Sequence, residues 1–175
     1  MIAVLLASLS FSLTSCGDDD DDEGPDNGGG SSLFINGAKA KFYSFPPSYE
    51  FSKRSYGIQC VFMADLSYDD TDYALEINVD ATSDTSDEAY NRLSNLNWVK
   101  VGADLAPEGY TTPDFYFSRG IVAGAYGEQP EYVSGNIVVK SKGKDNIVLT
   151  FNNYKCIMDE EEYTFKGDVT FIKQK

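Results

Sequence analysis

Near its C-terminus the chain reads YTFKGDVTFI (residues 163–172), and this stretch decides the fold. Aromatic and aliphatic side chains alternate there with threonine and charged side chains. The residues expected to face inward are Tyr163, Phe165, Val169 and Phe171. A period of two is typical of a β-strand with one buried and one solvated face. The stretch therefore predicts a strand that covers a core on one side only.

Similar segments precede it at short spacing. The C-terminal third contains three more predicted strands, at residues 132–140, 146–151 and 154–158. Turn residues at 142–145 and 159–162 separate these segments, as expected for an antiparallel meander.

The N-terminal part of the domain follows the same rules. Asn36-Gly37 lies between two extended arms at residues 33–43, and this pair favours the two-residue turn of a β-hairpin. Phe51 to Arg54 is interpreted as a polar connection. Further strands are predicted at residues 56–64, 73–80, 97–101, 115–117 and 120–126.

One helix is expected. Thr85-Ser86-Asp87-Glu88 matches a capping box, and apolar residues follow it at helical spacing, which predicts a short helix near residues 86–96. About nine strands with a turn every ten residues or so describe an all-β, antiparallel β-sandwich, with a lipocalin-like β-barrel as the alternative.

Composition narrows the chemistry. Residues 33–175 hold 21 acidic and 14 basic residues, a net charge of −7, which argues against nucleic acid or an anionic membrane surface as the main partner. The chain has no histidine. This excludes Ser-His-Asp and Cys-His catalysis and histidine-ligated metal sites, so we expect no cofactor and no catalytic residues.

The first residues carry a targeting signal. Residues 2–13 are uncharged and apolar, too short to span a bilayer as a helix but long enough for a secretory signal. The run lacks the Lys or Arg that normally opens such a signal, so we expect the natural start to lie upstream of Met1. It ends in Leu13-Thr14-Ser15-Cys16, which resembles the lipobox of bacterial lipoproteins, and five aspartates and Glu23 follow.

This combination resembles small Bacteroidetes surface lipoproteins of unknown function. The resemblance implies that residues 1–15 are a signal peptide, that Cys16 carries the lipid, and that the protein is anchored in the outer membrane at the cell surface. Residues 16–32 are then an acidic, glycine-rich tether, and residues 33–175 form a single domain. Alternatively, the acidic run is a solvated spacer that plays no part in targeting the protein to the cell surface.

Two sets of side chains are candidates for special roles. Flat aromatic rings with nearby carboxylates suit a glycan-binding surface, although a β domain of this size also needs such rings in its core. These rings are Trp98, Tyr110, Tyr116 and Tyr126. Cys60 and Cys156 lie in predicted strands, where they form either a disulfide or two separate buried thiols.

We therefore expect a non-catalytic binding or interaction module for glycans or a protein partner. An alternative is a lipocalin-like carrier of a small apolar ligand, which would need an empty interior. A third is a carboxylate-based hydrolase, which would need two close, pocketed acids with raised pKa values.

Overall fold

The computed structural model describes residues 30–43, 45–55, 57–82, 86–88, 91, 100–101, 113–120 and 129–175. Within these residues the structure is nearly all β. The strands are β1 (Ser32–Ile35), β2 (Ala38–Lys39), β3 (Lys41–Phe42), β4 (Ser48–Arg54), β5 (Gly57–Tyr68), β6 (Thr71–Thr82), β7 (Lys100–Val101), β8 (Asp114–Arg119), β9 (Glu131–Lys142), β10 (Asn146–Met158) and β11 (Glu161–Lys173). No helix in this part of the chain is long and apolar enough to cross a membrane.

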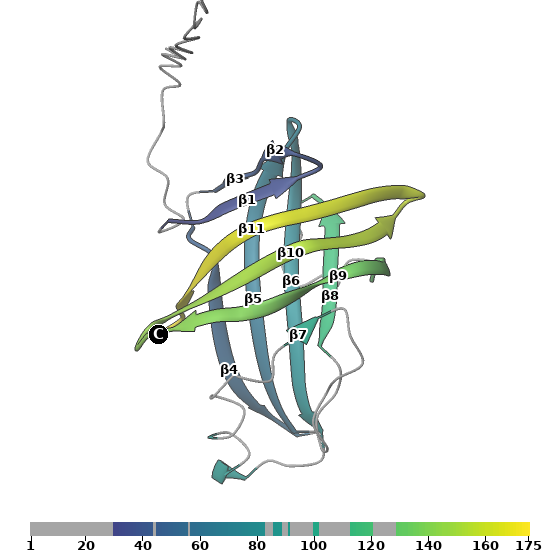
Figure 1. Cartoon of the computed structure of the whole chain (residues 1–175). Helices are drawn as coiled ribbons and strands as arrows, with labels where there is room; N and C mark the ends of the chain where they lie inside the picture. The colour runs from purple at the N-terminus through teal and green to yellow at the C-terminus, as the bar shows by residue number, and fades with distance from the viewer. Residues whose placement is uncertain are drawn as a thin grey trace, which may run out of the picture.

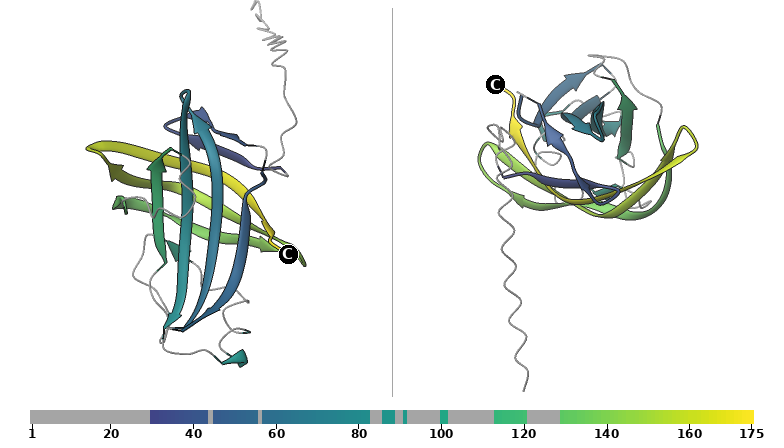
Figure 2. Two further views of the ribbon diagram at one scale, coloured as in Figure 1. Left: turned by 180° about the vertical axis from the view of Figure 1, so that it is seen from behind. Right: turned by 90° about the horizontal axis from the view of Figure 1, so that it is seen from above.

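The strands form one sheet that folds into two layers. Its order is β7-β9-β10-β11-β4-β5-β6-β8, with β1 added to β11, β2 to β1, and β3 to β5. The layer of β9, β10 and β11 runs across the layer of β4, β5, β6 and β8 (Figure 1). The right-hand view in Figure 2, from above, shows the strands curving around a shared interior. Over the described residues the sheet is not closed into a barrel, so the predicted sandwich class is confirmed in preference to the barrel.

The two layers meet at a single parallel contact. Pairing is antiparallel everywhere else, but Ile172 and Lys173 of β11 pair with Ser48 and Tyr49 of β4 in parallel. The backbone N–H of Ile172 also donates to the carbonyl oxygen of Pro47 at 2.8 Å. This short contact is the corner at which the sheet continues from one layer into the other, between two strands that are far apart in the chain.

Two sequence predictions are wrong. Phe51 to Arg54 is not a connection but the end of β4, paired with β5 along its whole length. Its last three residues are polar, but their backbones pair with Gly57 to Gln59 of β5, and this pairing keeps them in the sheet.

The segments at 146–151 and 154–158 are one strand, β10. Asn152 and Asn153 face a single position of β11, because the pairing shifts between Phe151 and Tyr154. Two residues opposite one make a β-bulge, which bends a strand without ending it.

The other predictions agree where they can be tested. Asn36 and Gly37 form the turn between β1 and β2. The predicted helix at 86–96 stays a prediction: Asp87, Glu88 and Asn91 have helical backbone, but apart from these and Ser86 its residues lie outside the described ones. Residues 97–99 and 121–126 of two predicted strands also lie outside them.

The core between the layers is built from aromatic rings. Phe165 of β11 is fully buried, with its ring centroid 4.9 Å from that of Phe117 and 5.4 Å from that of Phe115, both on β8. Its ring also lies 6.1 Å from that of Phe151 on β10. The two contacts with β8 are edge-on and join the layers, because β8 belongs to one layer and β11 to the other.

Gly167 of β11 lies at a very close contact with the backbone of β1. It has φ +120°, and a Cβ added there would collide with the carbonyl oxygen of Ser32 on β1. We predict that Gly167→Ala lowers the free energy of unfolding by about 2 to 3 kcal/mol, because β1 must move away from β11. Gly37→Ala is the control, since Gly37 also has a positive φ but open space around it. If thermal melts show that Gly167→Ala and Gly37→Ala lose equal stability, the close contact between β1 and Gly167 does not contribute to the loss.

Candidate functional site

Three hairpin tips that are far apart in the sequence meet at one end of the sandwich. The tips are Asn36-Gly37, Asp69-Asp70 and Asp159-Glu160, and each places both turn residues in left-handed backbone conformation. The side chain of Asn36 ties the first tip to the third. Its Oδ1 accepts from the backbone N–H of Thr164 at 2.8 Å, and its Nδ2 donates to the carbonyl oxygen of Glu162 at 3.3 Å.

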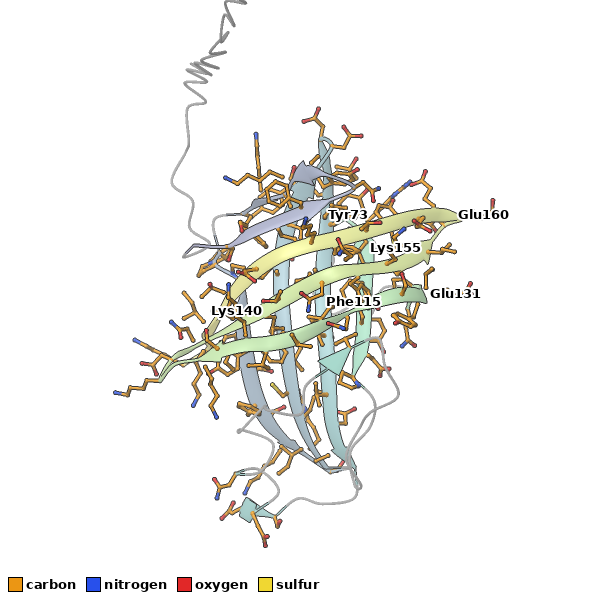
Figure 3. All side chains as sticks on the ribbon, viewed as in Figure 1. Tyr73, Phe115, Glu131, Lys140, Lys155 and Glu160 are labelled. Carbon is orange, nitrogen blue, oxygen red and sulfur yellow. The ribbon has the colours of Figure 1, made fainter. Side chains whose placement is uncertain are left out.

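An open cleft of about 500 Å³ lies between the tips. Figure 3 shows Tyr73 and Glu160 at this end of the molecule. The cleft is lined by Asn36, Tyr68, Asp69, Thr71, Tyr73, Arg119, Glu161, Glu162 and Tyr163.

Tyrosines that are rooted in the core make the base of the cleft. Tyr73 and Tyr163 are both buried, and the ring of Tyr73 stacks on that of Phe117 with centroids 4.5 Å apart. The ring of Tyr163 meets Phe117 edge-on at 5.3 Å. Half-buried Tyr68 lies beside Tyr73, at 6.2 Å between centroids. Because the core holds these rings, the base of the cleft is rigid before any ligand arrives.

Arg119 is fixed in the cleft by a hydrogen-bonded triangle. Its Nη2 donates to Glu161 Oε2 at 2.8 Å and to the hydroxyl of Tyr163 at 3.4 Å, and that hydroxyl donates to Glu161 Oε2 at 2.8 Å. The hydrogen bond to Tyr163 raises the pKa of Arg119 further above its usual value. Burial raises the pKa of Tyr163, so its hydroxyl keeps its proton at physiological pH.

The cleft has an acidic balance. Among the described residues that line it, Arg119 is the single basic side chain, against the carboxylates of Asp69, Glu161 and Glu162. Glu162 is paired with Lys155, at 2.9 Å between Oε1 and Nζ. The two glutamates are thus each held by a cation, and the site offers both hydrogen-bond donors and acceptors to a ligand.

The sequence predicted a different set of rings. Tyr116 is half-buried on the face of β8 opposite Phe115 and Phe117, and it does not line the cleft. Trp98, Tyr110 and Tyr126 lie outside the described residues, as does Cys16. The sequence did not predict the cleft residues because they flank hairpin turns, and sequence patterns predict each turn separately without showing which turns meet in space. Two acidic pairs, Asp69-Asp70 and Asp159-Glu160, were the available signal.

Cys60 and Cys156 are both buried free thiols, on β5 and β10 respectively. Burial raises the pKa of the Cys60 thiol well above its usual value and that of Cys156 to about 12. The thiolate is the reactive form, so both side chains are protected in the native state.

We therefore predict that a Cys16→Ser chain, kept free of reductant, takes up no alkylating reagent at pH 7 while folded. In denaturant the same chain should take up two equivalents, counted by mass spectrometry. A chain that takes up none when unfolded would instead contain a disulfide between Cys60 and Cys156.

Comparison of the chain with models of protein families, with characterised proteins and with solved structures finds no match. Within the described residues, no three His, Cys, Asp or Glu side chains are grouped so that they could hold a metal ion. The case for the cleft therefore depends on its own geometry: a rigid aromatic base, a fixed guanidinium and carboxylates on hairpin tips.

Proposed function

We propose that this chain is a non-catalytic binding module, held at the outer surface of the cell by a lipid on Cys16, and that the cleft between the three hairpin tips takes a neutral glycan. The observation that carries the proposal is the triangle of Arg119, Glu161 and Tyr163 above a base of buried tyrosines. It is a set of polar groups held in place by the core, as ligand sites usually are.

The charge of the cleft favours a neutral ligand over an anion. Three carboxylates surround one guanidinium that Glu161 already engages. An anionic ligand would be repelled, whereas the hydroxyl groups of a sugar can donate to carboxylates and accept from a guanidinium. The ring of Tyr68 offers an apolar face on which a sugar ring can stack.

The other two functions are less well supported. A carrier of apolar ligands needs an empty interior, but the core here is filled by Phe165 and the rings around it. A hydrolase needs a carboxylic acid that holds a proton, and burial raises the pKa of Asp65 and Asp80. Neither acid lines the cleft. By pairing register they lie about 20 Å apart on β5 and β6, too far to act as a couple.

A glycan array tests the ligand class. We expect the full chain carrying Cys16→Ser to bind a subset of neutral glycans, and Tyr68→Ala to lose that binding. Tyr132→Ala is the control, because Tyr132 is an exposed ring on β9 outside the cleft. An array without hits, or hits that survive Tyr68→Ala, would contradict the proposal.

The anchor is tested separately. We expect the chain, given a basic n-region before Met1 and expressed in a bacterium with lipoprotein-processing enzymes, to be found in the detergent phase, with a mass that starts at Cys16 and includes acyl chains. Cys16→Ser should move the protein to the aqueous phase. A parent chain without acyl groups would contradict the lipid anchor and leave the glycan result unaffected.

A further inference from the structure

The charges of this domain are separated along β11. The end that borders the cleft is exposed and acidic on balance, with carboxylates at 69, 70, 72 and 159–162 against the cations Lys39, Arg119 and Lys155. The opposite end of β11 reaches Lys173, twelve residues beyond Glu161, or about 40 Å along the strand. A net charge of −7 conceals this polarity.

Lysines gather at that second end. The backbone N–H of Lys173 donates to the carbonyl oxygen of Asp145, which places β11 against the turn between β9 and β10. We call Lys142, Lys144, Lys173 and Lys175 the basic corner, and all four are exposed. Within the described part of the chain, no ion pair involves Lys144, Lys173 or Lys175. Figure 3 shows Lys140, two residues before Lys142, on the same side of the layer as the C-terminus marked in Figure 1.

Exposed apolar side chains lie beside the basic corner. Ile172 is 39% exposed, and its backbone binds that of Pro47, two residues after Phe45. Phe45 is 78% exposed, the largest value among the large exposed apolar residues of the described chain. Exposed lysines together with exposed aromatic and aliphatic side chains are the combination that proteins use at a lipid headgroup layer.

The N-terminal segment enters the domain at the same place. The hydroxyl of Ser31 accepts from the backbone N–H of Thr170, two residues before Ile172. Ser32 pairs with Asp168 on β11. The tether therefore joins the domain nearer to the basic corner than to the cleft, so a lipid on Cys16 can bring the basic corner to the bilayer without the tether crossing the domain.

We infer that the basic corner, together with Phe45 and Ile172, contacts the anionic headgroups of the bilayer to which the chain is anchored, so that the cleft faces away from the membrane. This inference depends on the proposed lipid anchor in one respect, which is that the anchor holds the domain near a bilayer. The separation of charge gives the orientation, because the acidic end is repelled by the surface that attracts the basic end.

Vesicle cosedimentation with the unacylated full chain, Cys16→Ser, tests the contact. We expect binding to phosphatidylcholine vesicles that contain phosphatidylglycerol and much weaker binding to phosphatidylcholine alone. Each lysine near an anionic surface contributes about a fivefold gain in partitioning, so Lys173→Glu should weaken binding about 25-fold. Lys166→Glu is the matched control, an exposed lysine on the same strand seven residues from Lys173.

Three results would overturn the inference. The first is binding that Lys173→Glu leaves unchanged, or that Lys166→Glu weakens as strongly. The second is equal binding to both kinds of vesicle. The third is binding that appears only after Asp18 to Asp22 are changed to serine. This result would mean that the lysines bind the acidic run of the same chain in place of the bilayer. Because the chain used is unacylated and no glycan is present, failure here is distinct from failure of the anchor or of the glycan site.

Discussion

Phe165→Ala is expected to lower the free energy of unfolding by about 3 to 5 kcal/mol. The side chain is fully buried, and its ring contacts those of Phe115, Phe117 and Phe151, so the change removes the ring that joins the two layers and leaves a cavity between them. Domains of this size have a total stability of about 5 to 15 kcal/mol, so the variant should be close to unfolding at 37 °C. Urea denaturation followed by far-UV circular dichroism measures the loss.

Phe45→Ala is the control for this prediction. It removes the same ring from a side chain that is 78% exposed, and it should change the stability by no more than about 0.5 kcal/mol. If the two variants lose similar stability, the packing of β8 against β10 and β11 is not what holds the layers together.

Arg119→Gln is expected to weaken glycan binding about tenfold to a hundredfold. A hydrogen bond from a charged donor contributes about 1.5 to 3 kcal/mol, and the substitution removes the one basic group found among the described residues of the cleft lining. The stability of the domain should change little, because the Arg119 side chain is 49% exposed and that of Glu161 61%. Titration calorimetry with a glycan found on the array separates the two effects.

The chain offers a closely matched control in Arg54→Gln. Arg54 has a 44% exposed side chain and also lies beside a glutamate, Glu50, at 4.0 Å, but it belongs to the end of β4 and does not line the cleft. This variant should bind the glycan as the parent does. Equal losses for Arg54→Gln and Arg119→Gln would point to the overall charge of the domain, not to the cleft.

The strands were predictable wherever one face of the strand is buried and the other is exposed to solvent. Alternation from Tyr163 to Phe171 and from Tyr73 to Asp80 gave β11 and β6, and Asn36-Gly37 gave the first turn. Each of these signals is local, because the pattern and the turn are both contained within a few residues.

The failures have non-local causes. β4 ends in polar residues because its partner β5 supplies the pairing, which a sequence pattern does not contain. Asn152-Asn153 resembles a turn, but the neighbouring strands continue on both sides, so the chain makes a bulge there. Gly135 on β9 makes room for it, since a Cβ at that position would collide with the carbonyl oxygen of Asn153.

The candidate site was unpredictable for the same reason. Asn36, Asp69 and Glu161 are separated by more than thirty residues each, and only the crossing of the two layers brings their turns to one end. The basic corner is similar, since Lys144 and Lys173 meet through the pairing of β10 with β11. Net charge and residue counts do not report how charges are distributed over a folded surface.

The central claim is that three hairpin tips, distant in the sequence, form one ligand site. Backbone-amide chemical shifts test this claim most directly. A glycan found on the array is titrated into isotopically labelled parent chain carrying Cys16→Ser. The account predicts that amides at 36–37, 69–71 and 161–163 shift together with a single dissociation constant, while those of the basic corner remain unchanged. Shifts confined to the segment from Trp98 to Tyr126 would contradict it and place the ligand on the aromatic residues that the sequence alone had suggested.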